Sequence, residues 1–352
     1  MNFPFHAMLR RLRQRPAPPS PPVETLPGLK VHFDVVDKPN KVWRASQRGF
    51  RITVPRNPIL KRDSRIFTMG SCFAMEIRNA LQARDYEVFP KYASIAIDPG
   101  RQRVSKLPET EDVTHYDTFV IRQEFEQAFA KRHYELKDFL KHSHRLTNHF
   151  DVGGRTSWQD PYRRRVYGAN EEAILDISRK MDDCIAEGIE KADIFVITLG
   201  LAETWRNIEN GLHICLPPYD DARGGLDRFP HLEFYFSNYQ DNYDNLKRVC
   251  TLINDNLPGR NIVLTVSPVG LGRTYPERDV VVATIEAKSI LRAVAGQLSR
   301  EFDNVHYWPS YDLCVKDDIY REDGRHVRPD AVAMIVDTFI EAYTAPALAV
   351  AV

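Results

Sequence analysis

Two short motifs, far apart in the chain, carry side chains that could act as a nucleophile and as a base. Ser71 and Cys72 follow an apolar run that ends in Gly70, and they precede a segment with helical spacing. A strand, a tight turn and a helix in this order expose a side chain at a helix N-terminus, where nucleophiles and anionic intermediates are both favoured. Near the other end of the chain, Asp323 lies three residues before His326. A carboxylate can hold an imidazole in one tautomer, so the pair predicts a base for nucleophilic catalysis.

Both motifs also occur for purely structural reasons. Ser71 can cap the helix that follows it, and Cys72 can be a small buried residue beneath that helix. A pair such as Asp323 and His326 is common on polar surfaces. A thiol nevertheless suits the position, because a helix N-terminus or a neighbouring imidazole favours the nucleophilic thiolate. The residues alone therefore leave three interpretations open: a cysteine nucleophile, a serine nucleophile, and no nucleophile.

The segments between these motifs alternate between apolar strands and amphipathic helices. This alternation predicts a parallel sheet covered by helices on both faces, with its ligand site at the carboxyl ends of the strands. We expect strands over 66–70, 193–199, 261–266 and 304–308, with a short one over 86–90, and helices over 73–84, 114–131, 169–190, 239–256, 278–302 and 329–343. The apolar residues of the longest helix are Val282, Ile285, Leu291, Val294 and Leu298.

Two segments interrupt the alternation and a third precedes it. Segment 92–170 loses clear periodicity, and segment 207–238 is aromatic and contains Pro and Gly, so we expect both insertions to form a cap over the carboxyl edge of the sheet. Residues 1–28 combine repeated Pro with Arg, which is typical of a flexible tail. The chain is thus predicted to be one α/β domain over 29–352, with a basic tail that leaves room for a weak membrane-surface contact.

The composition excludes several classes of function. Lys plus Arg and Asp plus Glu number 48 each, so charge gives no argument for a nucleic-acid partner. No apolar run is long enough for a transmembrane segment, and five cysteines without a C-x-x-C pair indicate reduced thiols in a cytoplasmic protein. Nucleotide-binding glycine motifs are missing, so no cofactor is expected. No metal is expected either, because no closed ligand set accompanies the histidines of the first insertion, which are His133, His142, His144 and His149.

The first insertion also contains a basic run among aromatic residues. The arginines at 163–165 could bind phosphate or carboxylate, although a solvated charge run is the simpler interpretation. Trp158, Tyr162 and Tyr167 could stack on a sugar or anchor the insertion.

The two motifs and several others in the same order resemble the GSCFA family, which is named for the string at 70–74 and is similar to the SGNH (GDSL) hydrolases. The resemblance covers about 65–343 and rests on MGSCFA at 69–74, TLGLAETW at 198–205, LTVSPV at 264–269, YWPSY at 307–311, and Asp323 with His326. It implies a flavodoxin-like three-layer α/β/α sandwich with a parallel sheet. In register with the SGNH Gly-Asp-Ser motif, Cys72 takes the place of the nucleophile, His326 that of the base and Asp323 that of the orienting carboxylate.

The resemblance is weakest at the oxyanion hole. SGNH enzymes use the N–H of the nucleophile, a Gly N–H and an Asn side chain, but here the Asn position after Gly200 falls on Ala202, and the Gly block would lie near 93–94. We expect Gly70, Gly200, Glu203 and Ser267 to contribute to oxyanion or substrate binding. Glu203 could instead be a carboxylate at a helix N-terminus, and Ser267 could cap the turn that Pro268 imposes.

The leading function is acyl transfer at an ester, by a hydrolase or O-acyltransferase acting on an acylated substrate such as a carbohydrate. The loss of the Asn favours an alternative, an inactive SGNH-like module that binds glycans. A third and weaker interpretation is a membrane-surface scaffold that acts through the Arg-rich tail.

Overall fold

The computed structural model describes residues 31–37, 50–96, 102–104, 113–142, 157–163, 166–215, 229–314 and 319–346. The expected tail at 1–28 lies outside these residues.

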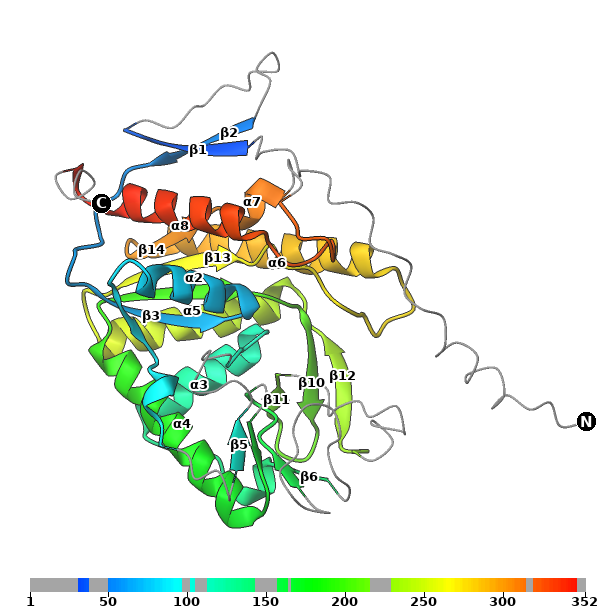
Figure 1. Ribbon diagram of the computed structural model, residues 1–352. Coiled ribbons are helices and arrows are strands. Elements are labelled where there is room, and N and C mark those ends of the chain that lie inside the picture. The colour runs from blue at the N-terminus through cyan, green and yellow to red at the C-terminus, as the bar shows by residue number, and fades with distance from the viewer. Residues whose placement is uncertain are drawn as a thin grey trace, which may run out of the picture.

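A five-stranded parallel sheet forms the centre of the molecule, with its strands in the order β4-β3-β9-β13-β14 (Figure 1). Numbered along the chain, this order is 2-1-3-4-5, the flavodoxin-like arrangement, so the predicted three-layer α/β fold is confirmed. Parallel pairing sets Gly70 beside Thr198 and Thr198 beside Thr265, which brings three strand ends to one edge. The strands are β3 (Arg65–Gly70), β4 (Glu87–Phe89), β9 (Ile194–Leu199), β13 (Asn261–Val266) and β14 (Val305–Trp308).

Helices cover both faces of this sheet. Side chains alternate along each strand, so Phe67 and Met69 of β3 join one hydrophobic cluster while Ile66 joins the other. The first cluster contains residues of α3 (Thr118–Ala130), α4 (Glu171–Lys191), α5 (Tyr239–Asn256) and α6 (Val280–Glu301). The second contains residues of α2 (Cys72–Gln82) and α8 (Pro329–Tyr343), which lie together in Figure 1.

Helix α6 departs from the expected packing. Leu291 is buried, but Val282 and Ile285 are exposed, at 56% and 54%. With 3.6 residues per turn, Val282 lies two and a half turns from Leu291 and therefore on the opposite side of the helix. The small residues Ala283 and Ala287 take the buried positions in this half of the helix.

Helix α3 lies within the segment expected to be the first insertion, but it packs directly on the sheet. Its Phe125 meets Phe67 edge to face, with ring centroids 5.8 Å apart, so this helix is part of the core. The rest of that segment includes the strands of a four-stranded sheet, which are β5 (Gln102–Val104), β6 (Leu140–His142), β7 (Ser157–Gln159) and β8 (Val166–Gly168), and the short 3₁₀ helices η2 (Tyr92–Ser94) and η3 (Leu136–Asp138).

A separate three-stranded antiparallel sheet follows β9. Its central strand begins at Glu203, so Glu203 is not at a helix N-terminus, contrary to one of the two expectations. The strands are β10 (Glu203–Asn207), β11 (His213–Ile214) and β12 (Leu232–Phe236). The remaining elements are the parallel pair β1 (Val31–Val36) and β2 (Phe50–Pro55) and the short helix α7 (Ser310–Cys314).

None of the helices in the described part of the chain is long and apolar enough to span a membrane. The described cysteines Cys72, Cys184, Cys215 and Cys250 are free thiols.

Candidate active site

The switch point of the sheet lies between β3 and β9, and two glycines make a close approach possible there. Gly70 ends β3 with φ +136°, and a Cβ on it would lie 2.0 Å from the Thr198 carbonyl oxygen. A Cβ on Gly200 would lie 2.7 Å from the carbonyl oxygen of Tyr116. Both positions therefore need glycine. Ligands of doubly wound sheets bind at such a switch point.

Ser71 is the N-cap of α2 and is buried. Its Oγ accepts from the Phe73 N–H at 3.3 Å, and its own N–H lies 3.0 Å from Thr198 Oγ1. The two hydroxyls are 3.2 Å apart. These contacts are those of a cap held against the neighbouring strand. Cys72, the first helical residue, is only partly buried.

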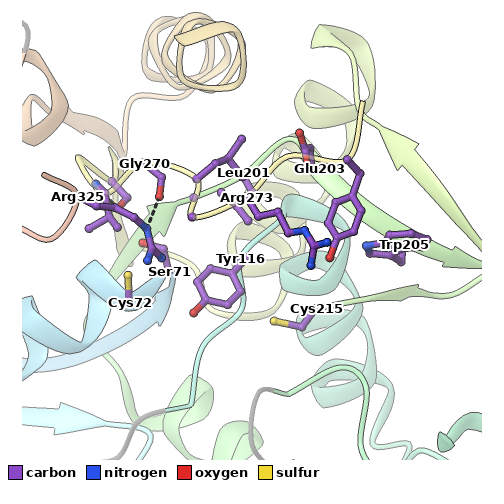
Figure 2. Close-up of a pocket in the computed structure, with 16 residues that line it drawn as sticks. Ser71, Cys72, Tyr116, Leu201, Glu203, Trp205, Cys215, Gly270, Arg273 and Arg325 are labelled. Atoms are coloured by element: carbon purple, nitrogen blue, oxygen red, sulfur yellow. Dashed lines mark hydrogen bonds between the residues drawn. The ribbon is translucent and has the colours of Figure 1, made fainter. Parts of the chain in front are cut away.

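Two cavities meet at Cys72. The larger one, of about 440 Å³, and the smaller one, of about 320 Å³, share four lining residues: Cys72, Tyr116, Val269 and Arg325. The larger cavity extends past Glu203, Trp205 and Arg273 (Figure 2). His326 lines the smaller cavity. Cys72 and His326 therefore line one space, and a second space opens on the other side of Cys72.

The Asp323 carboxylate makes two contacts with His326 and one with the preceding residue, Arg325. Its Oδ2 lies 2.5 Å from Nδ1 of His326, and its Oδ1 accepts the backbone N–H groups of Arg325 and His326 at 2.9 Å each. The hydrogen bond from the His326 ring, followed by those from the two backbone N–H groups, holds the pKa of Asp323 well below its usual range. Gly324 takes the left-handed conformation, φ +65°, that this tight loop requires. Because Nδ1 faces Asp323, Nε2 is the nitrogen available for proton transfer.

The loop that carries His326 is tied to both sides of the site. Arg321 donates to Glu76 of α2 at 3.1 Å, which links the loop to the helix that begins at Cys72. Tyr320 Oη donates to the Pro268 carbonyl oxygen at 3.1 Å. These contacts fix the loop that carries His326 against α2 and against the segment that follows β13.

Of the residues expected to bind the oxyanion or the substrate, Gly200, Glu203 and Ser267 line the larger cavity, whereas Gly70 lines neither cavity. Ala202, at the position of the SGNH Asn, is fully buried and also lines neither cavity. The Leu201 N–H donates to the Tyr116 carbonyl oxygen at 2.8 Å. The N–H groups of the residues on either side of Cys72 are likewise engaged, as described above.

The segment between β4 and α3 contributes a different residue to the site from the one expected. Neither Ala93 nor Ser94, where a Gly block was expected, lines the cavities, whereas Tyr116 lines both. Nothing local in the sequence identifies Tyr116. Arg273, which was also missed, follows the end of β13 within a Gly-rich loop, and that position could have indicated a site residue.

Glu203 is a buried carboxylate on the wall of the larger cavity. It is 7% exposed, its Oε1 accepts from the Thr274 hydroxyl, and its Oε2 has no hydrogen-bond partner among the described residues. Burial raises its pKa, although the Thr274 hydrogen bond acts in the opposite direction. Ser267 also lines this cavity, and its Oγ caps the turn at Pro268 by accepting from the Val269 N–H at 3.2 Å.

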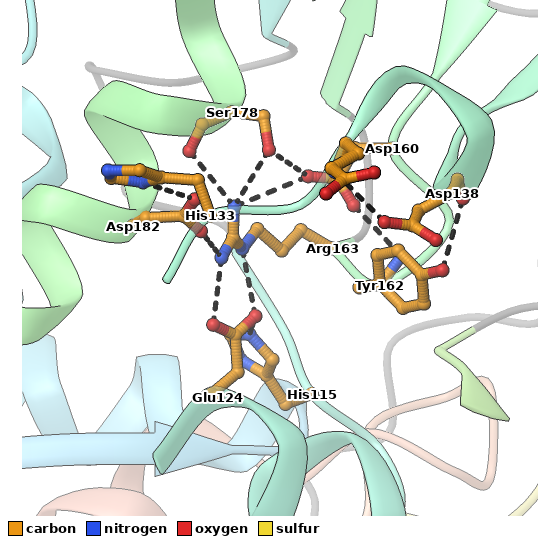
Figure 3. A network of polar contacts seen from close by, with 10 residues as sticks. His115, Glu124, His133, Asp138, Asp160, Tyr162, Arg163, Ser178 and Asp182 are labelled. Atoms are coloured by element: carbon orange, nitrogen blue, oxygen red, sulfur yellow. Dashed lines mark hydrogen bonds and ion pairs between the residues drawn. The ribbon is translucent and has the colours of Figure 1, made fainter. Parts of the chain in front are cut away.

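A buried ionic network links the first insertion to the switch point (Figure 3). Arg163 is 1% exposed and pairs with Glu124, Asp160 and Asp182. Glu124 also meets the His115 ring at 3.0 Å. The His115 N–H donates to the Gly70 carbonyl oxygen at 2.8 Å, so the network ends directly before Ser71 and Cys72.

This network changes the interpretation of the basic and aromatic run. Arg163 is not part of a solvated charge run, because its charge is compensated inside the protein; 164–165 lie outside the described residues. Trp158, Tyr162 and Tyr167 are buried, and Tyr162 stacks on Tyr134 at 4.1 Å, so these rings anchor the insertion. His133 contacts Asp182 at 2.9 Å, and no cluster of potential metal ligands occurs among the described residues.

The sheet order and the thiol at its switch point define a flavodoxin-like α/β protein with a cysteine-containing cavity. Residues 65–339 match the GSCFA family, and because the match spans most of the chain, the protein belongs to that family. Comparison with curated proteins gives no significant match. Among solved structures, the chain is similar to a Clostridium thermocellum family 3 carbohydrate esterase, with 10% identity and a TM-score of 0.31 over 79% of this chain and 94% of the esterase.

Proposed function

We propose that this GSCFA protein is an ester hydrolase or O-acyltransferase that uses Cys72 as its nucleophile, His326 as its base and Asp323 to orient the base. The observation that carries the proposal is the meeting of the two cavities at Cys72, with His326 on one of them. Ser71 is the less suitable nucleophile because its hydroxyl is buried and caps α2.

The proposed reaction has two halves. The Cys72 thiol gives its proton to Nε2 of His326 while its sulfur attacks the acyl carbonyl, and collapse of the tetrahedral intermediate breaks the ester C–O bond. The leaving alkoxide takes the proton from His326, which leaves a thioester on Cys72. Water or an acceptor alcohol then gives its proton to His326 and attacks the thioester, which restores the thiol with that proton.

The larger cavity supports a polyhydroxylated substrate. Glu203 offers a buried carboxylate oxygen to a donor, and Trp205 packs edge to face with Tyr275 on the same wall, with ring centroids 4.9 Å apart. Aromatic walls with a few polar groups are typical of sites that fix a ligand's orientation. A carbohydrate ester is therefore the substrate class that we propose. A reduced thiol is typical of the cytoplasm, which is the location expected from the sequence.

The experiment that tests the proposal is turnover of p-nitrophenyl acetate, combined with mass spectrometry of the trapped acyl-enzyme. We expect an acetyl adduct on Cys72 that disappears in Cys72→Ala, and a loss of about 10²–10⁴ in kcat for His326→Ala. Ser71→Ala should lose about 1 kcal/mol of stability, as for a missing cap, but still form the adduct.

A matched control is available in the same cavity. Cys215 lines the larger cavity, and its Sγ donates to the Thr114 carbonyl oxygen at 3.0 Å. Cys215→Ala should retain both turnover and adduct. Loss of the adduct in Cys215→Ala, or turnover that persists in Cys72→Ala, would refute the assignment of Cys72 as the nucleophile.

The second candidate function is an inactive glycan-binding module, which is favoured by Ala202 at the position of the oxyanion Asn. In that case, wild type would form no adduct, and Cys72→Ala would bind acetylated oligosaccharides as tightly as wild type in calorimetry. Glu203→Gln should weaken the binding of such ligands under either function.

A further inference from the structure

The missing Asn leaves the proposed reaction without one of its oxyanion donors. We infer that the Arg325 guanidinium supplies this donor, so that the loop that carries the base also carries the group that stabilises the tetrahedral oxyanion. The inference rests on the proposed thiol chemistry, because only an acyl carbonyl attacked by Cys72 develops the charge that Arg325 would meet.

The position of Arg325 is the first support. It is one of the four residues that line both cavities, together with Cys72, whereas its neighbour His326 lines only the smaller one. Figure 2 shows its guanidinium on the same side of the cavity as Ser71 and Cys72. A carbonyl that is attacked by the thiol at the junction of the cavities would therefore lie within the space that Arg325 borders.

The second support is that the side chain is held in place. Its Nε donates to the Gly270 carbonyl oxygen at 2.9 Å, and its backbone N–H donates to Asp323. The guanidinium lies against Gly272, where an added Cβ would be 3.1 Å from both Cζ and Nη1. With Nε committed to the protein, the Nη groups remain as donors for a ligand. A donor fixed before the reaction is worth more than one that must reorganise.

Other donors near the thiol fit less well. Arg273 lines only the larger cavity and lies over the Tyr275 ring, 5.5 Å from its centroid. Tyr116 lines both cavities, but its phenol is a neutral donor, and hydrogen bonds from a charged donor are about twice as strong. Tyr116→Phe is therefore the comparison that the test must include.

The test measures kcat and KM for p-nitrophenyl acetate, an uncharged ester, and the rate at which iodoacetamide alkylates Cys72. Arg325→Gln should lower kcat by about 10²–10³, the loss observed when one oxyanion donor is removed, with little change in KM or in the alkylation rate. Arg325→Lys should lose less, and guanidinium ions should partly restore turnover in Arg325→Ala.

Arg248→Gln is the matched control. Arg248 carries the same charge but lines neither cavity, and its Nε donates to Glu126 at 3.3 Å on the exposed side of α5. The variant should keep kcat within about threefold of wild type, because removing a charge alone leaves the oxyanion donors intact.

Several outcomes would overturn the inference. An Arg325→Gln variant with wild-type kcat, or a Tyr116→Phe loss with Arg325→Gln unaffected, would assign the donor elsewhere. An equal fall in kcat and alkylation rate would mean that Arg325 favours the thiolate instead, and a loss confined to anionic esters would make it a substrate-charge contact. If wild type forms no adduct on Cys72, the proposed function and this inference fail together; if the adduct forms and Arg325→Gln is fully active, only the inference fails.

Discussion

Replacing Asp117 by Asn should stabilise the protein at pH 8 and change its stability little at pH 4. Asp117 caps α3 directly after Tyr116, and its Oδ1 accepts the N–H groups of Phe119 and Val120 at 3.0 Å each. The carboxyl group is 1% exposed, and Oδ2 makes no hydrogen bond to the described residues. Burial raises its pKa from 3.8 to about 7, against the opposing effects of the Val120 and Phe119 N–H groups.

The sign and size of the effect follow from this shift. Between about pH 4 and pH 7 the folded state holds a proton on Asp117 that the unfolded state has lost, so the stability of the wild type falls as the pH rises. Three pKa units at about 1.4 kcal/mol each make the loss about 4 kcal/mol by pH 8. An Asn keeps the Oδ1 acceptor for the cap but has no proton to lose.

The assay is urea unfolding of both proteins from pH 4 to pH 8, read as the difference in free energy of unfolding. This difference should grow in favour of Asp117→Asn across the window. Asp279→Asn is the control, because Asp279 caps α6 from an exposed position. A difference for Asp117→Asn that stays flat with pH, or an Asn variant less stable than wild type at pH 8, would show that the folded protein tolerates the charge.

Three further substitutions test how the site is held. Gly272→Ala should displace the Arg325 guanidinium and lower kcat for p-nitrophenyl acetate at least about tenfold. The melting temperature should not change, because the Arg325 side chain can move at little cost. A lower melting temperature with full activity would contradict this prediction. Thr198→Val removes the hydroxyl that lies 3.0 Å from the Ser71 N–H and 3.2 Å from the Ser71 hydroxyl. The Ser71 N–H keeps the Thr198 carbonyl oxygen at 3.1 Å, so urea unfolding should show a loss of only about 1 kcal/mol. Arg163→Met leaves three buried carboxylates without their counter-charge, so the free energy of unfolding should fall by about 3–5 kcal/mol. A loss below about 1 kcal/mol would mean that water reaches these carboxylates.

Elements with strong local signals were predicted from the sequence. The helix at 239–256 was predicted to the residue, since Asn238 and Asp241 form a capping box at its start and a Pro-Gly pair follows its end. Pro329 likewise begins α8, where a missing N–H costs nothing. Strands buried on both faces were equally clear, because β9 and β13 read as continuous apolar runs.

Features that depend on tertiary contacts were not predicted. The strand that begins at Glu203 is defined by its antiparallel pairing with β12, about thirty residues later in the chain, and no local pattern announces that pairing. Arg163 lies in a run that reads as surface, yet it is compensated by the neighbouring Asp160 and by Glu124 and Asp182 from two helices. The exposure of Val282, in contrast, was predictable, because its spacing from Leu291 already places the two residues on opposite sides of the helix.

The same pairing explains why the oxyanion Asn has no counterpart at Ala202. The Ala202 carbonyl oxygen accepts both the N–H and the hydroxyl of Ser237, at 2.8 and 2.9 Å, and β10 begins at the next residue. The segment after Gly200 is thereby drawn into the small antiparallel sheet, and position 202 is fully buried outside both cavities. An Asn there would not face a substrate carbonyl. If the site is catalytic, its second donor must come from another loop at the carboxyl edge, and the loop that carries His326 already borders Cys72 through Arg325.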